Sequence, residues 1–329
     1  MIQYPLATLE KRKGDINMGL FNGYLRPGPG VDKDAPKKKG FFLYIDIIWQ
    51  KMGKLVGVNC LYSLTSIVWI AALYLFFGYL FIRTGVVDNI ANSIAQAEGL
   101  SADAALQLRA NAVVMLQIFF SVSVFVLWGS GPSSAAYAYV NRCFTRREPV
   151  WVASDGWDKF KENFKQGMLV VLIDAVILVL GVNALHFYYS FYLDTYNLLW
   201  LLVSYIMILA FVIYTMMHSY IYQIMVTFEC SLGAIYKNSL LLALAKLPGN
   251  ILTTAISCGI LYALFMVINL NPLFAAIMIL VFGLCFTRYV TDFYAARVIE
   301  KTILKNMKRK AAKEPVIEYL DEEPEDDGE

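Results

Sequence analysis

Six long apolar runs constrain this chain more than any other feature of its sequence. They cover residues 55–82, 111–130, 167–185, 198–217, 249–268 and 272–291. A helix needs about 20 mostly apolar residues to cross a bilayer, so each run is long enough to span one. Only 16% of the residues are charged, whereas soluble domains carry about 25%. The sequence therefore predicts an all-α, polytopic membrane protein with six transmembrane helices.

The distribution of lysine and arginine between the runs predicts the orientation. Basic residues collect before the first run, between the second and third, between the fourth and fifth, and after the sixth. The three opposite segments contain only Arg83 and Arg109. Positive charge near the ends of spans marks the cytoplasmic side. We therefore expect both termini in the cytoplasm and the six helices arranged as three hairpins.

A segment with helical periodicity precedes each of the three helices that run outward. The three segments are 41–54, 154–166 and 231–247. In the first, Asp46, Gln50 and Lys54 fall on one stripe, while aromatic and aliphatic residues face elsewhere. Amphipathic helices of this kind lie in the membrane interface. We expect three cytoplasmic elbow helices, with Ser154 capping the second and Pro248 breaking or kinking the third.

Composition divides the chain into three parts. Residues 1–40 are polar and rich in proline and glycine, which predicts a disordered cytoplasmic segment. Residues 41–300 would form the six-helix transmembrane domain. Residues 301–329 begin with a basic stretch that suits anionic lipid headgroups and end in an acidic tail. We interpret the acidic tail as disordered, and a docking segment is the alternative interpretation.

Glycine and proline predict two interruptions of the helices. Gly131 and Pro132, near the inner end of the second run, predict a helix kink. In the outer segment, Gly99 separates two short helices, and Ser101 is suited to cap the second. The next outer loop, 186–197, is rich in Tyr and Phe and indicates an interfacial aromatic belt. A sugar-stacking platform is the alternative interpretation of that loop.

Three charged residues stand out as intramembrane polar candidates: Asp174, Arg288 and Asp292. Asp174 lies roughly 10 Å below the cytoplasmic surface, at 1.5 Å per helical residue. A mid-span Asp costs about 2.5–3.5 kcal/mol on insertion scales, so it needs a partner or water. We hypothesise that Asp174 faces the bundle interior and pairs with Arg288, for which Asp292 competes. Such a pair would either hold helices together or belong to a proton or substrate relay.

No pattern typical of enzyme chemistry occurs in the sequence. The GxSxG, HExxH, P-loop and GxGxxG patterns are absent. His186 and His218 are too far apart to suggest a metal pair, and the five cysteines form no CxxC. We therefore expect no catalytic residue, no metal, no cofactor and no nucleic-acid partner. Membrane lipids are the expected partners, and another membrane protein is an additional candidate at the cytoplasmic face.

The segment between the fourth and fifth runs resembles a known docking loop. Glu229 is followed by Gly233, and Pro248 comes nineteen residues after Glu229. The cytoplasmic coupling loop of binding-protein-dependent ABC permeases similarly opens with Glu-Ala-Ala and closes with Leu-Pro. Here Cys and Ser replace the two alanines, and the glycine is displaced. The resemblance implies a partner-docking loop that contains Glu229, Gly233 and Pro248.

Four stretches together resemble the YesL-like family, which consists of uncharacterised integral membrane proteins of Firmicutes. They are the run that begins GLFNGYLRPGPG (19–59), GPSSAAYAY (131–139), RREPVWVASDGWDKFKENFKQG (146–167) and YKNSLLLALAKLP (236–248). Members often start near Met-Gly-x-Phe, which would make Met18 the natural start. The resemblance implies a bacterial cell-membrane protein that is linked to carbohydrate uptake and breakdown. It supplies no catalytic residue.

Three functional hypotheses follow. The first is a non-enzymatic accessory component associated with carbohydrate uptake, which acts through its cytoplasmic segments. The second is a small transporter, which needs a polar cavity around Asp174 and which a dry interior would argue against. The third is an ABC-permease-like subunit that docks an ATPase through residues 229–248. We favour the first, because it fits the few intramembrane polar residues and the large basic cytoplasmic face.

Overall fold

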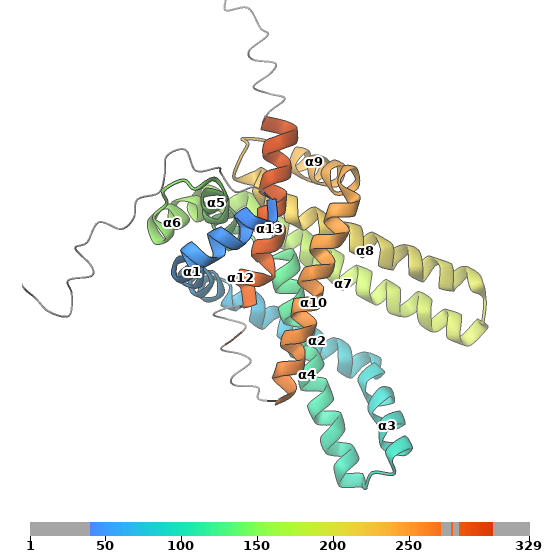
Figure 1. The fold of residues 1–329 in the computed structure, drawn as a ribbon. Helices are drawn as coiled ribbons and strands as arrows, with labels where there is room; N and C mark the ends of the chain where they lie inside the picture. The colour runs from blue at the N-terminus through green and yellow to red at the C-terminus, as the bar shows by residue number, and fades with distance from the viewer. Residues whose placement is uncertain (1–39, 271–277, 279–282, 305–329) are drawn as a thin grey trace, which may run out of the picture.

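The computed structural model describes residues 40–270, 278 and 283–304, and these residues form helices without a strand among them (Figure 1). Five helices are long and apolar enough to cross a membrane: Ile67–Thr84, Ala102–Trp128, Phe164–Thr195, Leu198–Met225 and Leu247–Val267. They correspond to the first five apolar runs and support a multi-pass membrane protein. Half of the sixth predicted run, 272–291, lies outside the described residues, so the six-span arrangement stays a prediction.

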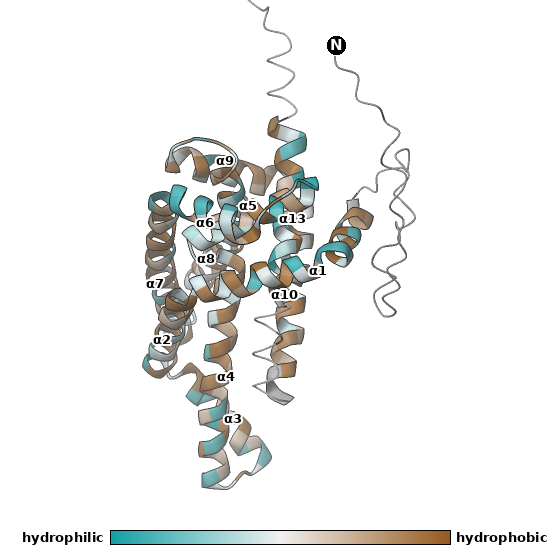
Figure 2. Ribbon diagram, turned by 90° about the vertical axis from the view of Figure 1, so that its left-hand side faces the viewer, coloured by the Kyte–Doolittle hydropathy of each residue, from teal (hydrophilic) through white to brown (hydrophobic). Residues whose placement is uncertain are grey.

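The first elbow differs from its prediction in length. Helix α1 (Gly40–Thr65) continues well past residue 54, with a kink at Lys51, and α2 (Ile67–Thr84) begins only after Ser66. The first span therefore starts about three turns later than hydropathy predicts. Hydropathy misses this break because apolar residues continue through it. Figure 2 shows α1 crosswise to α10 (Leu247–Leu270), as expected for an interfacial helix.

The segment between the first two spans confirms the predicted break at Gly99, but only the first of the two helices is short, because the second continues as the span α4. Helix α3 (Val86–Glu98) ends at Gly99, which adopts a left-handed φ of 61°. Ser101 then caps α4 (Ala102–Trp128), and its side chain accepts a hydrogen bond from the backbone of Ala104. The glycine supplies a conformation that other residues adopt at a cost.

Gly131 and Pro132 produce a complete break rather than a kink. Helix α4 ends at Trp128, and a separate helix, α5 (Pro132–Arg146), begins at Pro132. Gly129 and Gly131 have φ values of 94° and 69°, which favour glycine. Pro132 occupies the first helical turn, where its missing N–H leaves no bond unmade. The helix is therefore interrupted where the sequence predicts, but by a break between two helices and not by the predicted kink.

The other two elbows form separate helices that precede spans. Their order is α6 (Val152–Glu162), α7 (Phe164–Thr195), α8 (Leu198–Met225), α9 (Leu232–Ala245) and α10. Ser154 does not cap α6, because the helix starts two residues earlier and Asp155 accepts the backbone hydrogen bond of Trp151. Pro248 lies in the first turn of α10, directly after the break at Lys246, so its predicted effect is confirmed.

The core of the described part lies where α5, the second half of α8 and α13 (Arg288–Ile299) meet. Two further elements flank α13, namely α12 (Leu284–Phe286) and a π-helical turn at Glu300–Leu304. The α2–α4 and α7–α8 hairpins extend away from this core (Figure 1). Their ribbons are largely hydrophobic in colour (Figure 2), and many of their exposed side chains are large and apolar, as expected for lipid-facing spans. The core therefore lies toward the side that carries the basic segments.

Candidate functional site

Asp174 lies at the centre of a buried polar cluster between α7 and α8. Its carboxylate is 1% exposed. The hydroxyl of Tyr214 donates to Oδ1 at 2.6 Å, and Nε2 of His218 lies 3.0 Å from the same oxygen. The prediction that Asp174 faces the interior is confirmed, but the predicted pairing with Arg288 is wrong. We name Asp174, Tyr214 and His218 the Asp–His cluster.

The register of the α7–α8 hairpin explains why these residues meet. The turn is at Tyr196, and Asp174 and His218 are equally distant from it along the chain. Two antiparallel helices therefore place the two side chains at one level, and Tyr214 follows one turn away. The helices approach closely because Gly181 lies against the ring of Phe211, where a Cβ atom would collide. The equal distance of Asp174 and His218 from the turn is the sequence signal that predicts His218 as the partner of Asp174.

Aromatic rings enclose the Asp–His cluster. The indole of Trp128 stacks on His218, with ring centroids 5.6 Å apart and planes at 3°, and its N–H donates to Thr215. The hydroxyl of Tyr236 lies 3.4 Å from that of Tyr214. Burial raises the pKa of Tyr236 to about 12, so this hydroxyl keeps its proton at neutral pH.

Two buried atoms of the Asp–His cluster remain without a hydrogen-bond partner in the described part of the chain. They are Oδ2 of Asp174 and Nδ1 of His218. An acid and an imidazole 3.0 Å apart can share one proton, and their outer atoms can each accept or donate one more bond. The arrangement can therefore hold helices together and can also bind a proton.

Arg288 has a different role from the predicted one. Its Nη1 donates to the carbonyl of Val126 at 3.0 Å, in the last turn of α4. The guanidinium lies over the rings of Tyr62 and Tyr222, at 5.8 and 5.4 Å from their centroids. A cation at a helix C-terminus offsets the negative end of the helix dipole, and the tyrosine faces add cation–π attraction. Arg288 thus caps the helix that ends at the break.

Asp292 belongs to a second buried group, one turn further along α13. It is 2% exposed and accepts a hydrogen bond from the amide of Asn141 at 2.8 Å. Gln223 of α8 also lies within hydrogen-bond reach of this carboxylate. The structure therefore brings the three predicted polar residues into one core but distributes them over separate contacts.

The residues of the break between α4 and α5 contact several other helices. Hydroxyls of Ser66 and Ser130 are 2.6 Å apart, so the break after α1 is joined to the break after α4. The indole of Trp69 donates to the carbonyl of Gly129 at 2.9 Å. On the other side, Gly131 touches the backbone of Gly167 in α7, where a Cβ would lie 2.6 Å from the carbonyl oxygen of Gly167.

The predicted docking loop lies around α9. Glu229 and Gly233 are exposed at one end of this helix and Pro248 is exposed at the other. A helix of 14 residues separates them by about 21 Å, so the structure does not bring them together. One face of α9 packs on α8, and the exposed face carries leucines. No group of three or more potential metal ligands is found within the described residues.

One comparison with known proteins gives a match. The family model described as "Protein of unknown function, DUF624" matches residues 112–184. This stretch covers most of α4, the break, α5, α6 and the first part of α7, including Asp174. No curated protein and no solved structure matches the chain. The chain is thus similar over this stretch to an uncharacterised family.

Proposed function

We propose that this protein is a non-enzymatic accessory component of a bacterial carbohydrate-uptake system, located in the cell membrane with both termini in the cytoplasm. The observation that carries the proposal is the closed interior around Asp174. Asp174 and His218 are each 1% exposed, and Trp128 covers the imidazole. A transporter needs a polar path at this depth, whereas an accessory protein needs only a stable fold. The link to carbohydrate rests on the family resemblance alone.

The side that we propose to be cytoplasmic offers exposed aromatic residues for contact with another membrane protein. Trp49 on α1 is 84% exposed and Trp151, just before α6, is 81% exposed. Tryptophan is favoured both at membrane interfaces and in the centres of protein interfaces. The two residues belong to α1 and to the segment just before α6, and these two helices pack against each other.

Affinity purification from cells in a mild detergent tests this proposal. We expect the full-length protein to retain a membrane transport component that is identified by mass spectrometry. A Trp49→Ala/Trp151→Ala double variant should lose that component, whereas Phe187→Ala, which removes an exposed aromatic side chain at the far end of α7, should keep it. Recovery of the chain alone, at stoichiometric purity, would overturn the proposal.

A small transporter is the second candidate, and the Asp–His cluster is the observation that favours it. A buried acid beside a histidine is typical of proton relays in membrane proteins. Purified protein in liposomes distinguishes the two functions. Sugar uptake that occurs without any partner, and that Asp174→Asn abolishes, would replace the accessory proposal with a transporter.

The ABC-permease-like function has less support. The face of α9 that would meet an ATPase exposes Leu240, Leu241 and Leu244. Leucines on a helix that precedes a span suit the membrane interface. Co-purification of an ATP-binding subunit that Glu229→Ala releases would favour this third function over the first.

A further inference from the structure

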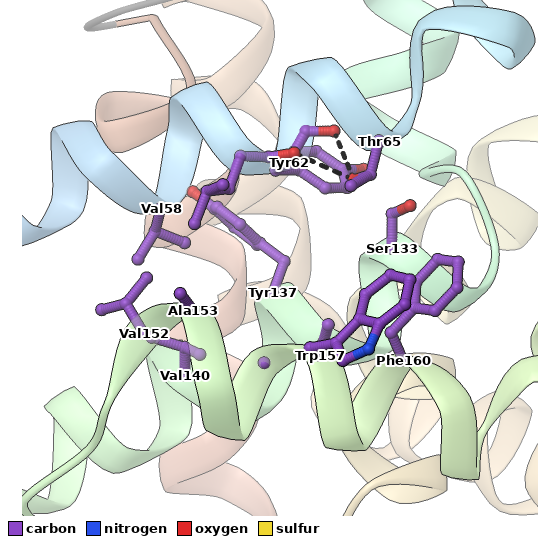
Figure 3. A pocket seen from close by; sticks show the side chains of 13 residues that line it. Val58, Tyr62, Thr65, Ser133, Tyr137, Val140, Val152, Ala153, Trp157 and Phe160 are labelled. Carbon is purple, nitrogen blue, oxygen red and sulfur yellow. Dashed lines mark hydrogen bonds between the residues drawn. The ribbon is translucent and has the colours of Figure 1, made fainter.

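A pocket opens between α1, α5 and α6 (Figure 3). Its volume is about 110 Å³. Val58 and Tyr62 line it from α1, and Val152, Trp157 and Phe160 line it from α6. Figure 3 shows these side chains around the space between the two helices.

The pocket exists because small residues line its centre. Gly156 stands in the middle of α6, where a glycine is less favourable than alanine by roughly 0.5–1 kcal/mol. A Cβ atom at Gly156 would meet only Cγ2 of Val140, at 3.9 Å, so steric conflict does not require this glycine. The glycine instead leaves room in the pocket, together with Ala153 on the same helix and Ala136 on α5.

The walls offer hydrocarbon and little free hydrogen-bonding capacity. The hydroxyl of Tyr62 is bonded to that of Ser134, and the hydroxyl of Tyr137 donates to Asn59. Thr65 donates to the backbone of its own helix. Polar atoms that are already bonded add no specificity for a polar ligand, so an apolar chain is the ligand that fits.

Positive charge lies beside the pocket on the same stripe of α1. Lys54 and Lys51 precede Val58 by one and two helical turns. Burial, and then the nearby charges of Lys54 and Arg147, lower the pKa of Lys51, which indicates a local excess of positive charge. Arg147 is paired with Asp46 at 2.6 Å, and the ammonium of Lys51 lies 4.8 Å from the centroid of the Phe144 ring. The exposed Lys54 is therefore the residue that meets an external anion, and Lys51 adds positive charge beside it.

We propose that this pocket binds one acyl chain of an anionic phospholipid from the adjacent leaflet, with its phosphate beside Lys51 and Lys54. The apolar walls select the chain, and the lysines select the headgroup charge. Helix α1, which lines the pocket, lies crosswise to α10 as an interfacial helix does (Figure 2), and this position suits a lipid that enters from the side. This inference is independent of the accessory function.

Photo-crosslinking in vesicles tests the proposal with the full-length protein. The probe is phosphatidylglycerol with a photoreactive acyl chain, in vesicles of phosphatidylcholine, and the adducts are mapped by mass spectrometry. We expect adducts concentrated on the pocket segments of α1, α5 and α6. Adducts spread evenly over the five spans would overturn the proposal. Evidence that another protein or a second copy of this chain occupies the pocket in place of the lipid would also overturn it.

Two pairs of variants distinguish the site for the acyl chain from the site for the lipid headgroup. Gly156→Leu should fill the pocket and reduce the adducts several-fold, while Gly233→Leu, at a helical glycine with open space around it, should leave them unchanged. Lys54→Glu should reduce labelling at least about fivefold, because the loss of one basic residue near an anionic surface costs about 1 kcal/mol and the new negative charge adds repulsion. Lys237→Glu is its exposed control on α9.

The probe headgroup supplies the remaining contrast. A photoreactive phosphatidylcholine should label the pocket several-fold less than phosphatidylglycerol does. Equal labelling by both lipids, or an unchanged adduct yield in Gly156→Leu, would overturn the proposal. If Gly156→Leu fails to fold, the adduct map of the unmodified protein and the Lys54 pair still decide it.

Discussion

At the scale of single residues, Asp174 is tied to its surroundings by two bonds on one oxygen. Replacement by leucine leaves the Tyr214 hydroxyl and His218 Nε2 without this partner inside the core. Each unmet buried group costs about 1–3 kcal/mol. We expect Asp174→Leu to lower the free energy of unfolding by more than 2 kcal/mol, as about the sum of two such losses, and Asp174→Asn to lower it less because an acceptor oxygen remains.

Thermal unfolding in detergent measures this difference. His186→Ala serves as the control, because His186 is the other histidine and lies half-buried near the outer end of α7. If Asp174→Leu unfolds at the same temperature as the unmodified protein, the cluster does not stabilise the fold.

The close contact between Gly131 and Gly167 leads to a second prediction for a single residue, the effect of Gly167→Ala on thermal stability. A Cβ atom at Gly167 would lie 2.6 Å from the backbone nitrogen of Pro132. Alanine usually stabilises a helix relative to glycine by about 1 kcal/mol, but overpacking against backbone costs about 1–3 kcal/mol. We expect Gly167→Ala to lower the melting temperature and Gly259→Ala, with nothing within 4 Å, to raise or keep it. The same direction of change in both variants would contradict the close helix contact.

At the scale of elements, Asn250 joins two helices and the turn between them. Its amide nitrogen donates to the carbonyls of Leu242 and Ala243, at the end of α9, and its oxygen accepts from Tyr220 at 2.7 Å. Each bond contributes about 0.5–1.5 kcal/mol. We expect Asn250→Leu to increase hydrogen exchange in the last turn of α9, whereas Asn238→Leu on its exposed face should not. Equal protection of α9 in both variants would show that Asn250 is not its cap.

The elements also show how far the sequence predicts the structure. Five spans and two elbows were predictable, because length, apolar period and the proline just after the break at Lys246 leave a direct mark on the sequence. The end of α1 at Thr65 was not, since the break at Ser66 is stabilised by Ser130, which is distant in the chain. Tertiary contacts of this kind leave no periodic signal.

The candidate site was predictable only in part, for the same reason. Burial of Asp174 follows from its place in an apolar run, whereas its partner depends on hairpin register. Arg288 looked like that partner because charge was considered without geometry. In the structure the guanidinium of Arg288 donates a hydrogen bond to the backbone carbonyl of Val126 near the end of α4. A prediction that considers only charged side chains does not include backbone carbonyls.

At the scale of the whole molecule, the basic segments predict which side of the membrane each loop occupies. Glu98, the last residue of α3, and Glu148, between α5 and α6, are both exposed and lie on opposite predicted sides. In a variant without the five native cysteines, a membrane-impermeant maleimide should label Glu98→Cys in intact cells. It should label Glu148→Cys only after permeabilisation.

The opposite labelling pattern would reverse the orientation and would place the pocket between α1 and α6 in the outer leaflet. That outcome requires the translocation of the segment 142–165, with six basic residues, across the membrane, while Arg83 and Arg109 stay inside. Positive residues close to span ends resist translocation, and short loops follow this rule most closely. Because α5 and α6 also pack tightly against α1, the basic segment would have to cross before this core forms. We therefore expect labelling of Glu148→Cys to depend on permeabilisation under all growth conditions.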